Sequence, residues 1–307
     1  DLLTEVKEVS VVSRYTIDLV TNQPVPILLN KLTGIPITSK RYMEETNEKW
    51  PIGTGAYKLL EYEPKDHVTL VRFENYSLGD PQIKKVIFTI IQNSEERKDA
   101  LINQEIHIME HVPEMYVNEI QNSSGITLKK VSNPTVWYIS FDFRQNNSSG
   151  FPGTKNPLAD VRIRKAMYHA IDVDSLITRL SLDVEPASQF LSPLIFGYNP
   201  EINRLPCDVN LSRQLLSSAG YENGFHLTLD CPEEYPTLIN LSEEIVRQFS
   251  QIVNVSLNLI PAEEYYHKLY DGNCSVYIMG WIPATGDGGE IFDYLLRSEH
   301  DPLGIGS

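Results

Sequence analysis

The sequence predicts an α/β protein with mixed sheets flanked by helices, and three observations predict it. The 307 residues are 41% hydrophobic and 22% charged, which is the balance of a globular protein. The most apolar run, residues 86–91, is far shorter than the ~18–20 residues that a membrane span needs. Strand patterns dominate up to about residue 130, and strands then alternate with helices, as in an α/β lobe.

The first part of the chain is expected to be rich in paired strands. Apolar and polar residues alternate over residues 6–11 and again over 15–19, which is typical of a hairpin. A short apolar segment at 27–29 indicates a helix. Ser94 is expected to cap a short helix over residues 94–101. Further strands are predicted at 57–62, 68–73 and 86–91.

Strand–helix alternation begins near residue 131. Residues 135–143 are almost continuously aromatic or β-branched, which predicts a buried strand. Asp160 is in position to cap a helix over residues 161–171, and Gly220 is in position to end a helix over 211–219. The other expected elements are helices at 174–181, 238–251, 262–270 and from 290, and strands at 227–230, 255–260 and 275–279.

Charge and motifs exclude several classes of function. With 26 basic and 41 acidic side chains, the net charge of −15 repels phosphate backbones and argues against a nucleic-acid partner. The glycines at 53 and 55 lack the rest of a phosphate-binding loop, and no hydrolase nucleophile motif occurs. No cofactor is therefore expected. The three cysteines, Cys207, Cys231 and Cys274, are compatible either with one disulfide and a free thiol or with three buried thiols.

A series of motifs occurs in one order along the chain. Residues 52–59 read Ile-Gly-Thr-Gly-Ala-Tyr-Lys-Leu, residues 160–172 read Asp-Val-Arg-Ile-Arg-Lys-Ala-Met-Tyr-His-Ala-Ile-Asp, and Gly280 precedes Trp281. Together they resemble the extracellular solute-binding proteins of ABC importers, specifically the peptide/nickel class known as family 5. This class includes oligopeptide- and dipeptide-binding proteins, and the matching stretch extends from about residue 50 to residue 297.

The resemblance implies a two-lobed clamp of the periplasmic-binding-protein-like class II, incomplete at both ends because family members are considerably longer. Residues 1–50 would be the tail of the small second domain, 51–131 part of domain I, and 132–307 domain III, the lobe that closes on the ligand. The implied protein is a binding protein and not an enzyme. It would be extracellular or periplasmic, a lipoprotein anchored in the membrane through an N-terminal segment that precedes these residues.

The resemblance also implies where a ligand is held. The candidate ligand-binding residues are Trp281, Gly280, Ala284, Tyr138, Trp137 and Asp287. Peptide binders of the family carry an Asp three residues after the Trp, where it holds the α-amino group of the ligand. In this chain that position is Ala284, and Asp287 matches a later Asp whose role in the family is more structural.

The implied ligand is a di- or oligopeptide, which a monomeric protein would deliver to the membrane subunits of an ABC permease. Because Ala284 stands in place of the family's Asp, a nickel complex or an oligosaccharide stays open as the ligand. A ligand-sensing interaction protein is the alternative from another class. An enzyme built on the same lobe would need a nucleophile or a metal constellation, and the sequence shows neither.

Overall fold

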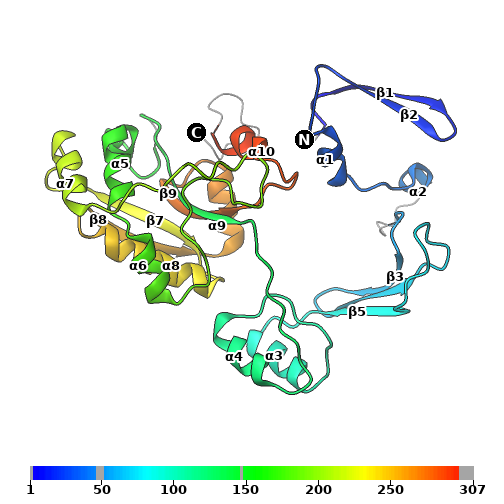
Figure 1. Ribbon diagram of the computed structural model, residues 1–307. Coiled ribbons are helices and arrows are strands. Elements are labelled where there is room, and N and C mark those ends of the chain that lie inside the picture. The colour runs from blue at the N-terminus through cyan, green and yellow to red at the C-terminus, as the bar shows by residue number, and fades with distance from the viewer. Residues whose placement is uncertain (1–2, 46–51, 146–147, 297–307) are drawn as a thin grey trace. The chain divides into compact units, whose positions relative to one another are not determined.

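The computed structural model describes residues 3–45, 52–145 and 148–296 of the chain (Figure 1). These residues fall into two compact units. Unit 1 combines the described residues of 1–32 and of 133–307, and unit 2 those of 33–132. Among the described residues, no helix has the length and apolarity that crossing a membrane requires.

Unit 1 begins with a two-stranded ribbon. Strands β1 (Val6–Ser13) and β2 (Thr16–Thr21) pair antiparallel, with Val11 opposite Ile17. Helix α1 (Leu28–Thr33) follows in the chain. The predicted hairpin and the predicted short helix are both confirmed.

The main element of unit 1 is a mixed four-stranded sheet. In spatial order its strands are β6 (Val136–Phe141), β9 (Val276–Trp281), β7 (His226–Pro232) and β8 (Asn254–Ile260). Strand β7 runs parallel to both of its neighbours, and β6 runs antiparallel to β9. The strand predicted at residues 135–143 is confirmed as β6, but it is not fully buried: it is an edge strand that pairs on one side only, and Trp137 stays 48% exposed.

Helices cover this sheet, and four of the helical segments named below begin at a side-chain cap. Asp160 Oδ1 accepts the backbone N–H of Arg162 at 2.8 Å, which confirms the predicted cap. Gly220 follows the helix it was expected to end and has a left-handed φ of 85°. The helical segments of unit 1 after residue 133 are η1 (Pro157–Ala159), α5 (Val161–His169), α6 (Val173–Leu180), α7 (Val209–Ser218), α8 (Pro236–Phe249), α9 (Ala262–Tyr270), α10 (Gly289–Ile291) and the π-helical turn η2 (Phe292–Leu296).

Each face of the sheet is buried under its own hydrophobic cluster. Successive side chains of a strand point to opposite faces, so Val276 and Ile278 belong to one cluster and Tyr277 to the other. The first cluster packs residues of α5, α6, α7 and α8 against the sheet. The second contains residues of α9 and α10, together with Leu191 and Ile195. This burial on both faces explains why β9 is apolar along almost its whole length, since its side chains enter both clusters.

Unit 2 holds a three-stranded antiparallel sheet and two packed helices. Its elements are α2 (Lys40–Glu45), β3 (Tyr57–Glu63), β4 (His67–Arg72), β5 (Lys85–Thr89), α3 (Ser94–Ile102) and α4 (Glu114–Asn122). The N-cap of α3 is Asn93 rather than the predicted Ser94, because Asn93 Oδ1 accepts the N–H groups of Glu95 and Glu96. Helix α4, which the sequence pattern did not predict, is held to α3 by an ion pair between Lys98 and Glu119.

A charged cluster joins two helices of unit 1 on the outside of the sheet. The carboxylate of Glu244, on α8, accepts hydrogen bonds from Arg247 at 2.8 and 2.5 Å and from Gln248 at 3.1 Å. Arg179, from α6, lies 3.2 Å away, and the Glu244 side chain is only 5% exposed. The hydrogen bonds from Arg247 lower the pKa of Glu244 to about 2.

We expect Glu244→Gln to lower the free energy of unfolding by about 1–3 kcal/mol at pH 7, because the buried Gln248 amide and two half-exposed guanidinium groups lose a charged acceptor. Since folding lowers the pKa of Glu244 from its ordinary 4.5 to about 2, the carboxylate stabilises the fold above pH 4.5. That contribution is lost as the pH falls from about 4.5 through about 2, so the difference between variant and wild type should shrink over this range. Urea unfolding followed by circular dichroism measures it. Glu243→Gln, at the exposed neighbouring position, should have little effect.

Gly150 is a position where any side chain meets Ser275. A Cβ at Gly150 would lie 2.1 Å from Ser275 Oγ and 2.6 Å from Ser275 Cβ. We expect Gly150→Ala to destabilise unit 1 by about 1–3 kcal/mol in thermal or urea unfolding. The double variant Gly150→Ala with Ser275→Gly removes the clashing atoms and should be more stable than Gly150→Ala alone. Additive losses in the double variant would contradict this explanation.

Candidate functional site

All six candidate residues lie at one edge of the four-stranded sheet. Because β7, β8 and β9 run parallel, their carboxyl ends meet at the same edge, and the antiparallel β6 begins there. Trp281 is the last residue of β9 and pairs with Val136, the first residue of β6. Ala284 and Asp287 follow Trp281 in the loop to α10. Residues that are up to 150 positions apart in the sequence therefore share one edge.

The connections of the sheet diverge at this edge. The chain leaves β7 through α8, which packs in the first cluster, and it leaves β8 through α9, which packs in the second cluster on the other face. Strand β8 lies on one side of β7, and β9 lies on the other. In open α/β sheets, ligands bind outside the carboxyl ends of the strands where the connections diverge in this way. The edge therefore has the topology of a ligand-binding site.

The pleat of the strands divides the candidates between the two faces of the sheet. Tyr138 and Trp281 pack against the second cluster. Trp137 pairs with Gly280 on the opposite face, where a Cβ on Gly280 would come within 2.9 Å of the Trp137 ring and 3.0 Å of Thr135 Cγ2. Glycine at position 280 therefore lets the Trp137 indole lie directly against the backbone of β9.

Tyr138 and Trp281 lie among further aromatic rings. The Tyr138 ring meets Phe190 edge to face at 5.3 Å between centroids, and Trp281 lies 6.1 Å from Tyr294. The Tyr138 hydroxyl and Trp281 Nε1 are both buried and have no hydrogen-bond partner among the described residues. Burial raises the pKa of Tyr138 above its ordinary value, so the phenol keeps its proton at neutral pH.

The loop after Trp281 is organised around one buried carboxylate. Glu290 accepts the backbone N–H groups of Ala284 and Thr285 and the Thr285 hydroxyl, each at 3.0 Å. Asp287 serves the loop in a similar way, since its Oδ1 accepts the N–H of Gly289 at 2.7 Å. The sequence pattern assigned Glu290 only to the start of a helix. No pattern in the sequence indicates that the Glu290 carboxylate would accept the backbone N–H groups of Ala284 and Thr285.

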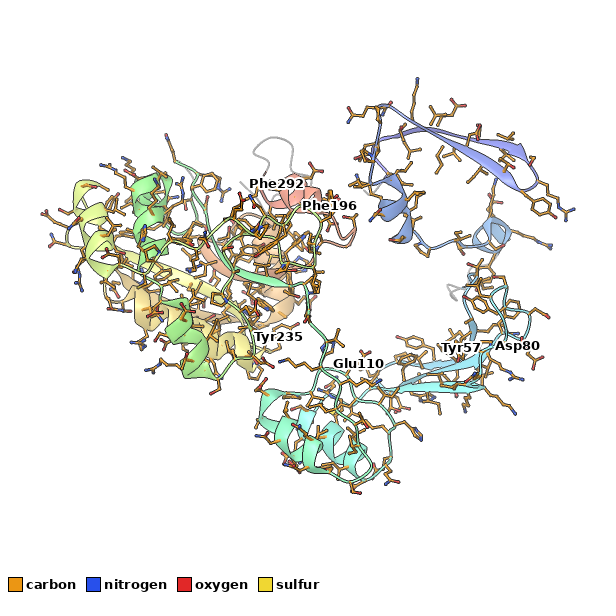
Figure 2. The ribbon with its side chains drawn as sticks, viewed as in Figure 1. Tyr57, Asp80, Glu110, Phe196, Tyr235 and Phe292 are labelled. Atoms are coloured by element: carbon orange, nitrogen blue, oxygen red, sulfur yellow. The ribbon has the colours of Figure 1, made fainter. Side chains whose placement is uncertain are left out.

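A second segment of unit 1, which contains Leu191 and Phe196, contacts the same loop. The backbone N–H of Phe196 donates to Gly286 at 3.1 Å, and the Gly288 N–H donates back to Phe196 at 2.9 Å. A Cβ on Gly288 would lie 2.6 Å from a methyl group of Leu191, so this close approach requires glycine. Figure 2 labels Phe196 and, on the turn after α10, Phe292; both side chains are mostly exposed.

The thiols are not arranged for catalysis. Cys231 and Cys274 are buried, Cys207 is exposed, and all three are free. Burial raises the pKa of all three thiols, that of Cys274 to about 12, so they stay protonated and are poor nucleophiles at neutral pH. Within the part of the chain that the structure describes, no three His, Cys, Asp or Glu side chains are placed to hold a metal ion.

Comparison with known proteins finds relatives along almost the whole chain. The dipeptide-binding protein of Escherichia coli is 27% identical over 309 residues, covering 95% of this chain and 55% of that protein. Heme-binding protein A of Haemophilus influenzae is 24% identical over 263 residues, covering 83% of this chain and 46% of its own length. The chain thus spans about half the length of these relatives.

Solved structures agree with the fold described above. A dipeptide-binding protein of a Pseudoalteromonas species, in complex with Met-Leu, matches with a TM-score of 0.81 at 19% identity. The match covers 98% of this chain and 61% of that one. NikA of Brucella suis in complex with Fe(III)-EDTA gives 0.82 at 19% identity, covering 99% and 64%.

The sequence profile of one family covers nearly the whole chain. Residues 2–302 match the family described as bacterial extracellular solute-binding proteins, family 5 Middle. The chain therefore belongs to family 5 of the bacterial extracellular solute-binding proteins.

Proposed function

We propose that this protein is the substrate-binding component of an ABC importer, which captures di- or oligopeptides outside the membrane and delivers them to the permease as a monomer. The observation that carries this proposal is the aromatic pair Tyr138 and Trp281 at the edge where the sheet connections diverge. Aromatic rings offer a large contact area at low entropic cost, which suits ligands whose side chains vary.

The relatives support peptides as the ligand class. The Escherichia coli relative is named as a dipeptide-binding protein, and a Helicobacter pylori relative that is 25% identical was solved in complex with the peptide STSA. The Haemophilus influenzae relative is named for heme, so the family accommodates chemically different ligands. The test of the function must therefore identify the bound molecule directly.

The proposed mechanism is a hinged clamp. In this proposal residues 1–50 belong to the small second domain, 51–131 to domain I, and 132–307 to domain III, the lobe that closes on the ligand. A ligand that binds the closed form more tightly shifts the protein toward closure, and the closed form docks on the permease. Its proposed contacts are Trp281, Gly280, Ala284, Tyr138, Trp137 and Asp287.

Native mass spectrometry of the whole protein, purified without denaturation, tests the ligand class. We expect denaturation to release a set of molecules whose masses differ by amino-acid residues. A single non-peptide mass or a metal adduct would contradict the peptide proposal and favour a metal complex or a sugar. A protein purified from cells grown without peptides, and then loaded with a defined dipeptide, is the control for carry-over.

Replacing Trp281 should weaken peptide binding strongly. We expect Trp281→Ala in the whole protein to raise the Kd for peptides by about 30-fold, because buried Trp anchors contribute about 2 kcal/mol or more. Isothermal titration calorimetry measures the change, and circular dichroism checks that the variant folds. Phe292→Ala is the control, because it also removes a large aromatic side chain but at an exposed position after the same loop. This variant should bind peptides with the affinity of the wild type. Equal affinity of wild type and Trp281→Ala would argue against this site.

A further inference from the structure

Two buried hydrogen-bond donors at the candidate site have no partner. The Tyr138 hydroxyl and Trp281 Nε1 are shielded from solvent and form no hydrogen bond with the described residues. Buried polar atoms in folded proteins are nearly always paired, so such an atom calls for a partner outside the described protein groups. An indole N–H can only donate, and a protonated phenol can also donate. A partner shared by both groups must therefore be an acceptor, because the indole N–H can pair with nothing else.

The sheet register brings these two donors into reach of one group. Val136 pairs with Trp281 and Tyr138 pairs with Met279, so Tyr138 and Trp281 are diagonal neighbours on the same face. Diagonal neighbours of an antiparallel pair lie roughly 7–8 Å apart at their Cα atoms, within reach of long aromatic side chains. A single carboxylate or carbonyl group between the rings can accept from both.

The carboxylates of the adjacent loop are already occupied. Glu290 receives two N–H groups and a hydroxyl from the loop itself, and Asp287 Oδ1 receives the Gly289 N–H. The backbone N–H of Ala284 donates to Glu290, and the side chain of Ala284 is only a methyl group. Both loop carboxylates are thus engaged by the loop itself, and position 284 offers no carboxylate of its own, whereas the Tyr138 hydroxyl and Trp281 Nε1 stay unpartnered.

We propose that the ligand places a hydrogen-bond acceptor oxygen, a carboxylate or a peptide carbonyl, between the Tyr138 hydroxyl and Trp281 Nε1. This inference rests on the proposed function, since it names the part of the peptide that the site holds. The group reaches the donors when the Phe190 or Tyr294 ring, each in contact with one of the two, shifts aside. The α-amino end of the peptide then lies away from Trp281.

The decisive variant is Tyr138→Phe in the whole protein, with trialanine, its C-terminal amide and its N-acetyl derivative as probes. Removing an unpartnered buried hydroxyl should leave the melting temperature of the ligand-free protein unchanged or raise it. The same variant should weaken trialanine binding by about tenfold, because it removes a donor to the ligand. Trp281→Phe, which removes the N–H and keeps an aromatic ring, should weaken binding in the same direction.

The matched control is Tyr265→Phe, another buried tyrosine of the second cluster. Its hydroxyl donates to the Ile278 carbonyl at 2.5 Å, so this variant should lose stability and keep its affinity for trialanine. The amide separates the two acceptors. If the carboxylate is the acceptor, amidation removes most of the effect of Tyr138→Phe, and if a peptide carbonyl is the acceptor, the effect persists. Acetylation should change the affinity little in either case.

Three results would overturn the inference. The first is normal trialanine binding by both Tyr138→Phe and Trp281→Phe, which would mean that water alone satisfies the two donors. The second is a clear loss of stability in ligand-free Tyr138→Phe, which would mean that the hydroxyl has a partner within the protein. Both leave the proposed function standing. The third, failure of the wild type to bind any of the three probes, would overturn the peptide proposal together with this inference.

Discussion

The burial of both faces of the four-stranded sheet is the constraint on which the rest of unit 1 depends. Strand β9 sends alternate side chains into two separate clusters, so helices must cover both sides of the sheet. Placing α8 on one face and α9 on the other makes the chain leave neighbouring strands in opposite directions. The same requirement that stabilises the core therefore creates the divergent edge at which Trp281 ends its strand.

The loop at this edge is held by hydrogen bonds to groups that lie outside the sheet. Its backbone donors would be costly to leave unpaired, and the buried Glu290 carboxylate satisfies those of Ala284 and Thr285. Phe196 adds two backbone hydrogen bonds from a distant segment. Binding sites work best when their supporting groups are held in place by a second layer of contacts, and here that layer includes backbone and carboxylate pairing and the Asn30 amide, which donates to the Thr285 carbonyl at 2.8 Å.

The chemistry of unit 1 agrees with the solute binding for which its family is named. The buried thiols are held in the protonated form, and an ion pair such as the one between Arg179 and Glu244 ties α6 to α8. What the candidate edge offers is aromatic area and hydrogen-bond donors. These are the means of recognition, and a binding protein needs its ligand to supply the complementary acceptors.

The sequence by itself determined the elements and the family, because period-two and helical patterns, caps such as Asp160 and the ordered motifs are all local. It misplaced the cap at Asn93 by one residue and missed α4, since neighbouring polar residues compete for a cap and a short helix has little periodicity. The tertiary structure was needed to place β6 at the edge of the sheet, which leaves Trp137 half exposed, and to show that Glu290 holds the loop after Trp281. Strand order and the partners of a buried polar atom arise from contacts between distant segments, which no local pattern encodes.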